Sequence, residues 1–250
     1  MFNFNKENHT YTLDDKPLTG VTTILSVVAK PALIQWSANE AINYVEEYLR
    51  AGNTILSLGE PTVEKMLKEA RTAHRRKKED AGQKGVDIHS LVENWIKDGS
   101  LPEEPNEQLI NFISWAQENK VKFLASEQQV YSRKYWYAGT YDFICEIDGK
   151  KYVGDLKTSS GIYGREYFAQ CAAYRLAYNE IENTKERSFI EKLLGKWPEG
   201  KDPFHGVVIV RCGKNGDFEV KYSFDYKTDK KIFLACLELY RGLQTFNATK

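Results

Sequence analysis

The chain has 250 residues, of which 42% are hydrophobic and 28% are charged, a composition typical of a globular protein with one large domain or one domain and an appendage. Lysine and arginine together number 35, as do aspartate and glutamate, so the formal net charge is zero and a bulk polycation is excluded. The N-terminal stretch is too polar for a signal peptide and no apolar run is long enough to span a bilayer, so we expect a cytoplasmic protein with no membrane partner.

The first half of the chain is predicted to be mostly helical. Short strands are expected over residues 1–14, and the stretch LTGVTTIL leads into a first helix. Further helices are expected where apolar residues recur with helical spacing, over 31–52, 60–99 and 105–119. Within the second of these, Gly82 and Gly85 predict a break.

The second half of the chain alternates strands with helices. Strands are expected over 121–134, 137–147, 150–157, 205–213 and 217–225. Helices are expected over 163–181 and 227–246, and a loop over 195–204. This order predicts an α/β fold of the mixed α+β kind, with a central mixed β-sheet flanked by helices. We assign residues 1–120 to N-terminal strands and a helical subdomain, and residues 121–250 to the core.

The stretch YAGTYDFICEIDGKKYVGDLKTSS, residues 137–160, predicts a β-hairpin that brings two acids together. Asp148-Gly149 is a strong turn signal, because a type I′ turn needs positive φ at both central residues. With this pair as the turn, Asp142 faces Asp155 on the same side of the sheet, with Cβ atoms roughly 4.5–5.5 Å apart. Two like charges at that distance are destabilising, so something must compensate them.

Three kinds of compensation are open at this point: a proton on one carboxylate, a basic residue between the acids, or a bridging divalent cation. Asp155 and Lys157 are two residues apart on one strand, so they share a face. Asp142, Asp155 and Lys157 are therefore expected to converge. The alternative is a surface hairpin whose acids and lysine simply solvate one another.

Two helical features bear on this patch. Gln170 and Tyr174 lie four apart on one face of the helix that follows Lys157. The alternative is an aromatic stripe that faces the core, in which Gln170 would need a hydrogen-bond partner. His89, in GVDIH, lies beside an apolar helix face, where a histidine is more often structural than a metal ligand.

The densest basic stretch precedes His89, and we expect it to bind DNA. Such a run is usually a solvated helix face, but here it could lead phosphates toward His89. Its members are Arg71, Arg75, Arg76, Lys77, Lys78 and Lys84.

The four cysteines are far apart in apolar contexts, without a CxxC pair, which argues against zinc or iron–sulfur ligation. We expect buried thiols in a reducing compartment. They are Cys145, Cys171, Cys212 and Cys236.

The motifs GTYD, DLK and QCAAY, in this order and preceded by GVDIH, resemble the PD-(D/E)XK nuclease superfamily in its RecB-like branch. That branch includes CRISPR-associated exonucleases, and the mitochondrial genome-maintenance exonuclease is similar. The stretch YTLDDKPLTGVTTIL also resembles phage-encoded members. The resemblance covers about Tyr11 to Tyr178 and implies a restriction-endonuclease-like core.

The resemblance also implies the roles of individual residues. His89, Asp142, Asp155 and the carbonyl of Leu156 would ligate Mg²⁺ or Mn²⁺. Lys157 would orient or activate the attacking water, or stabilise the charge that develops on the phosphate.

Further residues are expected around this centre. Gln170 and Tyr174 would help to position DNA or Lys157, and Glu127 is a candidate for an additional catalytic acid. Thr158 and Ser159, which follow Lys157 directly, are expected to contact DNA. Some relatives carry four cysteines around an iron–sulfur cluster; the spacing here departs from that pattern, so we expect no cluster.

These roles imply a metal-dependent DNA exonuclease that acts from free ends, prefers single-stranded DNA or tails, and serves recombination, repair or replication. We expect it in a bacterial cytoplasm, or as a phage protein in the host cytoplasm, with a recombination or replication protein as a candidate partner. The alternatives are a non-catalytic module that binds DNA ends and a structure- or sequence-specific endonuclease.

Overall fold

The computed structural model describes residues 1–28, 31–51, 60–194 and 202–248, apart from some side chains within helices and turns. The chain forms two compact units, one made of Met1–Val28 with Ile88–Lys250 and the other of Ala29–Asp87. Helix α3 (Glu60–Asp98) contributes its last turns to the first unit and its other residues to the second. The first unit contains the sheet.

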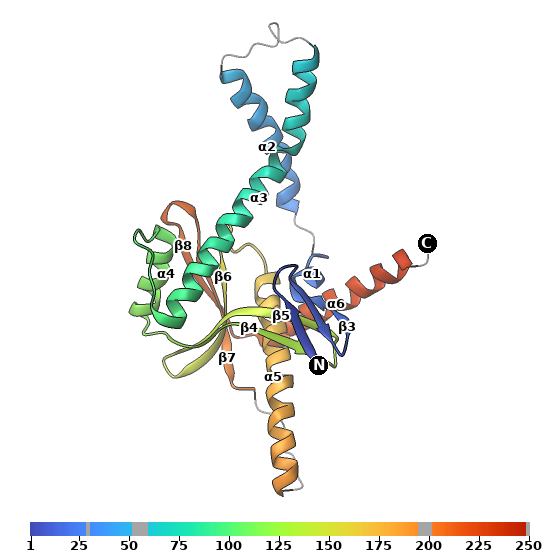
Figure 1. The fold of residues 1–250 in the computed structure, drawn as a ribbon, viewed down its shortest axis with the longest axis vertical. Helices are drawn as coiled ribbons and strands as arrows, with labels where there is room; N and C mark the ends of the chain where they lie inside the picture. The colour runs from blue at the N-terminus through green and yellow to red at the C-terminus, as the bar shows by residue number, and fades with distance from the viewer. Residues whose placement is uncertain (29–30, 52–59, 195–201, 249–250) are drawn as a thin grey trace. The chain divides into compact units, whose positions relative to one another are not determined.

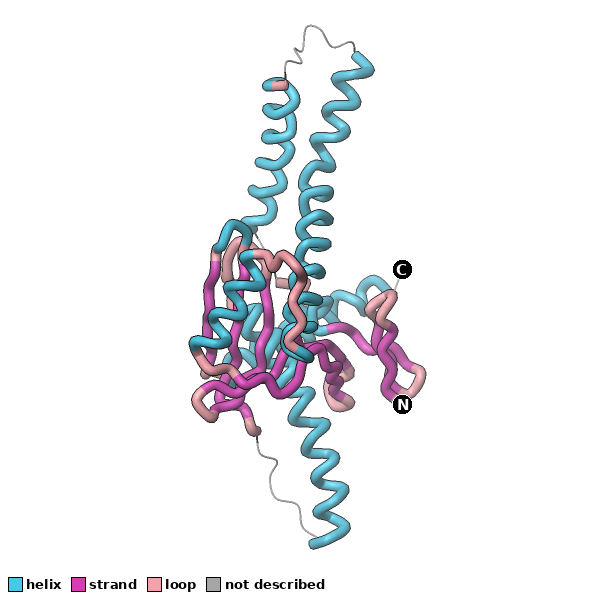
Figure 2. The backbone as a smooth tube through the Cα atoms, turned by 60° about the vertical axis from the view of Figure 1, so that its left-hand side comes forward, coloured by secondary structure: helices cyan, strands magenta, loops and turns pink. Residues whose placement is uncertain are grey.

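The sheet has eight strands in the order β1-β2-β3-β5-β6-β7-β8, and β4 pairs with β5. Figure 2 draws the strands in magenta and the helices in cyan. The β3–β5 and β6–β7 pairs are parallel and the others are antiparallel, which confirms the predicted mixed sheet. The strands are β1 (Phe2–Asn5), β2 (Thr10–Leu13), β3 (Lys16–Gly20), β4 (Lys122–Ser132), β5 (Tyr137–Ile147), β6 (Lys150–Lys157), β7 (Phe204–Cys212) and β8 (Phe218–Ser223).

Helices accompany this sheet on both faces (Figure 1). In the same unit as the sheet these are α1 (Val21–Leu25), the last turns of α3, α4 (Glu107–Glu118), α5 (Glu166–Leu194) and α6 (Tyr226–Ala248), with a short 3₁₀ turn at Lys214–Gly216. Helix α2 (Pro31–Arg50) belongs to the second unit. Asn106 caps α4 by accepting a hydrogen bond from the backbone of Leu109. The mixed α/β class predicted from the order of elements is therefore confirmed.

Apolar side chains fill both faces of the sheet. Neighbouring residues of a strand point to opposite faces, and Phe143 and Ile144 of β5 accordingly belong to two different clusters. Phe143 packs with Phe112 of α4, and Ile144 belongs with Tyr174 of α5 and Phe233 of α6. The site described below lies in the sheet between these two layers.

Most predicted elements are present, with three corrections among the described residues. The helix predicted to end at residue 181 continues as α5 to Leu194. Residues 16–20 form strand β3, which the sequence did not predict, because its pairing with β2 and β5 is made only in the folded chain. The helix predicted to break at Gly82 and Gly85 is continuous, because an isolated glycine costs a helix only about 1 kcal/mol relative to alanine. Most of the loop predicted over 195–204 lies outside the described residues.

The compact units divide the chain differently from the boundary predicted at residue 120. Helix α4 and the last turns of α3 belong with the sheet, because Ile88, Leu109 and Phe112 are buried in the same cluster as Phe143. The structure thus places His89 in the unit that carries both hairpin acids.

Candidate active site

The hairpin of β5 and β6 has the predicted register. Its pairs run from Ile147 with Lys150 to Phe143 with Gly154, and the turn residues Asp148 and Gly149 have φ values of 49° and 72°. The ladder ends at Phe143 with Gly154, one step before the predicted pair of Asp142 with Asp155.

Strand β5 changes its neighbour at Asp142. It pairs with β3 through Tyr137 and Ala138, and with β6 only from Phe143 onward. Beyond that point the Asp142 carboxylate takes the place of a backbone partner, because its Oδ2 accepts a hydrogen bond from the backbone nitrogen of Leu156 at 2.5 Å. We call this opening between β5 and β6 the fork. The role of the Leu156 carbonyl as a metal ligand stays a prediction.

Three side chains from three elements converge beside the fork. His89 of α3, Glu127 of β4 and Asp142 of β5 each offer one ligand atom, and these atoms lie within 4.8 Å of one another. His89 Nδ1 is 3.5 Å from Asp142 Oδ1. Two carboxylates and an imidazole form a donor set that suits Mn²⁺ well and Mg²⁺ acceptably. The group could therefore hold a divalent cation.

Glu127 joins this group with a backbone conformation that its residue type seldom adopts. Its φ is 49°, in the left-handed region that non-glycine residues seldom adopt within a strand. Burial and the charge of Asp142 together raise the pKa of the Glu127 carboxyl to about 7, although His89 opposes the change. A strained backbone and a raised pKa are features that cluster at functional sites.

Asp155 has a different set of partners. The carboxylate is only 1% exposed, and its Oδ1 accepts a hydrogen bond from Gln170 Nε2 at 2.8 Å. Its Oδ2 forms an ion pair with the Lys157 ammonium group, yet accepts no hydrogen bond of regular geometry from a described residue. Gln170 Nε2 also lies 3.0 Å from the Tyr174 hydroxyl. The predicted convergence of Asp142, Asp155 and Lys157, with Gln170 as a partner, is thus present.

The two hairpin acids have pKa shifts in opposite directions. Burial raises the pKa of Asp155 to about 6, because the opposing charge of Lys157 offsets burial only in part and Asp142 adds to the rise. Burial acts on Asp142 as well, but the neighbouring His89 and Lys157 outweigh it and hold the pKa of Asp142 below its usual value. The environment thus separates the two acids, which is one way in which adjacent carboxyl groups acquire different roles.

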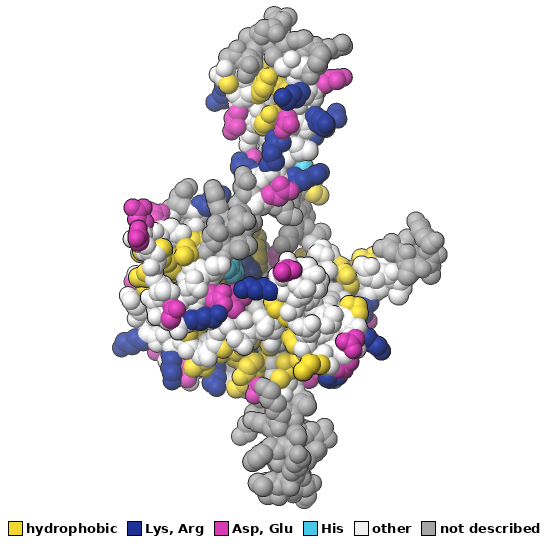
Figure 3. Space-filling model, viewed as in Figure 1, with side chains coloured by type: hydrophobic (Ala, Val, Ile, Leu, Met, Phe, Trp, Pro, Cys, Tyr) yellow, Lys and Arg dark blue, Asp and Glu magenta, His cyan; other side chains and the backbone are white. Residues whose placement is uncertain are grey.

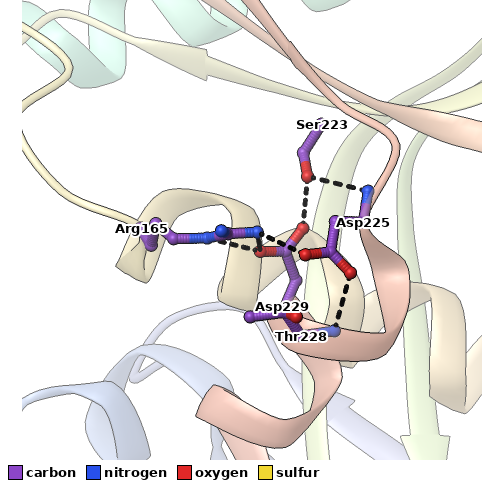
Figure 4. Close-up of polar contacts among 5 residues, drawn as sticks. All are labelled: Arg165, Ser223, Asp225, Thr228 and Asp229. Carbon is purple, nitrogen blue, oxygen red and sulfur yellow. Dashed lines mark hydrogen bonds and ion pairs between the residues drawn. The ribbon is translucent and has the colours of Figure 1, made fainter.

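A polar cluster fixes the start of α5, which carries Gln170 (Figure 4). Arg165 donates two hydrogen bonds to Oδ1 of the buried Asp229, at 3.1 and 2.8 Å. The hydroxyl of Ser223 donates to the other oxygen of Asp229. These contacts connect the N-terminus of α5 to β8 and α6, and so hold the turn that presents Gln170 to Asp155.

Arg211 supports the loop after β6, a role that the sequence did not reveal. It lies beside Lys157 in the parallel β6–β7 register, and its Nη1 donates to the carbonyl of Ser159 at 3.4 Å. The Ser159 hydroxyl donates to the carbonyl of Gly161 within the same loop. Contact of Thr158 or Ser159 with DNA stays a prediction. The signal that could have found Arg211 is an arginine within the apolar run of β7.

Four side chains of the basic stretch are described, and they fall into two pairs. Arg71 and Arg75 are exposed, and no described acid forms an ion pair with either. Arg76 pairs with Glu69, and Lys77 pairs with Glu40, each at 2.6 Å.

The side chains of Lys78 and Lys84, the other predicted DNA contacts of this stretch, lie outside the described residues. On the face drawn in Figure 3, lysine and arginine side chains alternate with aspartate and glutamate. This mixture agrees with the zero net charge, so an anionic ligand would depend on a few unpaired cations.

The cysteines are all buried free thiols, as predicted. Burial raises the pKa of both Cys145 and Cys212 to about 12, so these thiols are not nucleophiles at neutral pH. Among the helices that the structure describes, none combines the length and the apolar composition needed to cross a bilayer.

Neither a protein-family model nor a curated protein sequence matches the chain. The function is therefore argued from the site and from the motifs of the sequence.

Proposed function

We propose that the protein is a Mg²⁺- or Mn²⁺-dependent DNA exonuclease of the PD-(D/E)XK superfamily. The observation that carries the proposal is the convergence of His89, Glu127 and Asp142 beside the ion pair of Asp155 and Lys157. Two facing carboxylates, a lysine two residues further along the strand and a helix-borne glutamine occur in the order that the resemblance implies.

His89, Glu127 and Asp142 would hold the cation, with Asp155 adjacent to them. One observation favours this fit: the ligand oxygens and nitrogen of these three residues already lie within 4.8 Å of one another. When bound there, a divalent cation lowers the pKa of a coordinated water and neutralises charge on a phosphate.

The protein's own groups would do the rest of the work. Lys157 presents a partly buried ammonium group beside the acids, where it can hold a water molecule or stabilise the negative charge that grows on the phosphate. Gln170 restrains the Asp155 carboxylate and is itself held by the start of α5. Tyr174 extends this chain of contacts.

The substrate class follows from the motifs. The RecB-like resemblance favours linear DNA with a free end, single-stranded or carrying a single-stranded tail, in recombination, repair or replication. Arg71 and Arg75, exposed and without an ion pair among the described residues, are two cations of the second unit that can contact phosphates.

The proposal is tested by digestion of end-labelled single- and double-stranded linear DNA beside covalently closed circles, with Mg²⁺, with Mn²⁺ and with EDTA. We expect linear DNA to be shortened from its ends, circles to persist, and EDTA to stop the reaction. Cleavage of closed circles would indicate an endonuclease. Binding to ends without metal-dependent cleavage would indicate the non-catalytic module.

The basic stretch gives a prediction with a matched control. Replacement of Arg71 and Arg75 by glutamine is expected to weaken binding of single-stranded DNA and to lower its salt dependence by about 1.4 in the log–log slope, since each phosphate contact to a single strand contributes about 0.7. Replacement of Arg76 and Lys77 removes the same charge, but these cations are already paired with acids, so the slope should change less. Binding is measured in EDTA across a salt series. Equal slopes for the two double variants would contradict the assignment.

A further inference from the structure

A cavity of about 580 Å³ opens between β2, β3, α1 and β5, in the unit that carries the candidate active site. A pocket of this volume can enclose one drug-sized molecule, and a mononucleotide is a molecule of that size. Most of its polar groups are hydroxyls, from Thr10, Thr12, Thr19, Thr22, Thr23 and Thr140.

The cavity would contact the phosphate and sugar of a ligand through neutral polar groups. Among the described residues that line it there is no lysine, arginine, aspartate or glutamate. The hydroxyls of Thr12, Thr19 and Thr22 make no hydrogen bond to a described residue, so they are available to a ligand. The partly buried Tyr240 also lines the cavity, and its ring could face a base.

Two residues of the cavity wall, Thr140 and Tyr174, are neighbours of residues at the fork. Thr140 lines the cavity and shares a face of β5 with Asp142, two residues away. The Tyr11 hydroxyl lies 3.0 Å from Thr140 Oγ1. On the other side, Tyr174 contacts Gln170, which donates to Asp155. Residues of the cavity wall therefore connect to both hairpin acids.

We propose that this cavity binds the terminal nucleotide of the DNA strand, so that the next phosphodiester lies at the fork. The inference rests on the proposed nuclease function and adds the place where the strand ends. In the reaction a water oxygen bonds to phosphorus, the bond from phosphorus to the leaving oxygen breaks, and that oxygen takes a proton from the water. Because the cavity has room for about one nucleotide, the released product should be a mononucleotide.

Two variants of the full chain test the cavity in different ways. Thr12→Val with Thr22→Val removes two hydroxyls and keeps the branched shape of both side chains. Gly20→Leu places a side chain toward the cavity without backbone strain, because Gly20 has φ of −68° and a Cβ there would be 3.5 Å from Thr23 Oγ1 and 3.9 Å from the Tyr11 ring. Thr245→Val is the matched control, since Thr245 is exposed on α6 and does not line the cavity.

The measurements are the Kd for a single-stranded 20-residue oligothymidylate with Ca²⁺, the Mn²⁺ affinity, and the length of the products formed with Mg²⁺. Thr12→Val with Thr22→Val should weaken oligonucleotide binding about tenfold or more, since each lost hydrogen bond is worth roughly fivefold. Gly20→Leu should weaken it about as much, because the added side chain occupies space that the nucleotide would fill. Mn²⁺ affinity should not change, and the wild type should release mononucleotides. The control should match the wild type in all three measurements.

The outcomes separate this inference from the proposed function. If the wild type degrades DNA but both cavity variants bind the oligonucleotide as tightly as the control, the cavity is not the terminal-nucleotide site and the nuclease proposal stands. If the wild type degrades no DNA with either metal, the nuclease proposal fails and the inference fails with it. Wild-type products several nucleotides long would also overturn the inference, whatever the effect of the variants on binding.

Discussion

The Asp142→Asn variant is expected to lose detectable DNA cleavage and to bind Mn²⁺ more than about 100-fold less tightly than the wild type, because loss of partners outside a ligand shell already costs about 10- to 100-fold. Asp142 belongs to the three-residue group with His89 and Glu127, and its other oxygen accepts from the Leu156 backbone. The amide oxygen of asparagine can still accept that hydrogen bond, so the hairpin should remain folded. Calorimetric titration with Mn²⁺ and cleavage of end-labelled single-stranded DNA measure the two effects.

Asp15→Asn is the matched control for this variant. Asp15 is an exposed turn residue with φ of 61°, a conformation that asparagine also tolerates, and it does not belong to the metal-binding group. A second readout does not need activity: Mn²⁺ should raise the unfolding temperature of the wild type and of Asp15→Asn, but not that of Asp142→Asn. Cleavage by Asp142→Asn at the wild-type rate would refute the assignment of Asp142 as a ligand.

The hairpin could be predicted from the sequence because its determinants are local. A two-residue Asp-Gly turn fixes the register, and the register then decides which residues face each other across β5 and β6. The position of Lys157 beside Asp155 follows from strand alternation alone. Gln170 could be suggested as a partner because helix spacing places it on one face with Tyr174, although only the fold shows that this face meets Asp155.

The position of Glu127 beside Asp142 depends on structural features that no short sequence pattern encodes. The β4–β5 pairing contains a register irregularity between Phe123 and Ala125, and Glu127 itself adopts a positive φ. Either feature alone would redirect a side chain to another face. The sequence identifies Glu127 as an acid on the strand before Asp142, but its proximity to His89 depends on the tertiary structure.

The second large loss of activity is expected from substitution of Lys157. Lys157→Met keeps the length of the side chain but removes the charge, so turnover should fall by about 100- to 1,000-fold, the usual range for the loss of one group that stabilises transition-state charge. Oligonucleotide affinity and Mn²⁺ affinity should change little, because a group that acts chiefly in the transition state affects kcat more than binding. Single-turnover cleavage and calorimetry measure these quantities.

Lys157 also balances the buried Asp155, so its removal has a structural cost that must be separated from catalysis. Breaking a buried ion pair on one side costs roughly 3–5 kcal/mol of stability, which denaturant unfolding of Lys157→Met should reveal. Lys157→Arg keeps a cation beside Asp155 and should retain most of that stability, yet a planar guanidinium cannot replace a compact ammonium group at the reacting phosphate. Its turnover should therefore still fall at least about tenfold.

The control is Lys151→Met, which replaces an exposed lysine on the same strand, opposite Glu146. This variant should leave both stability and cleavage unchanged. If Lys157→Arg cuts DNA at the wild-type rate, Lys157 serves only as a counter-ion for Asp155 and the catalytic role proposed for it is wrong.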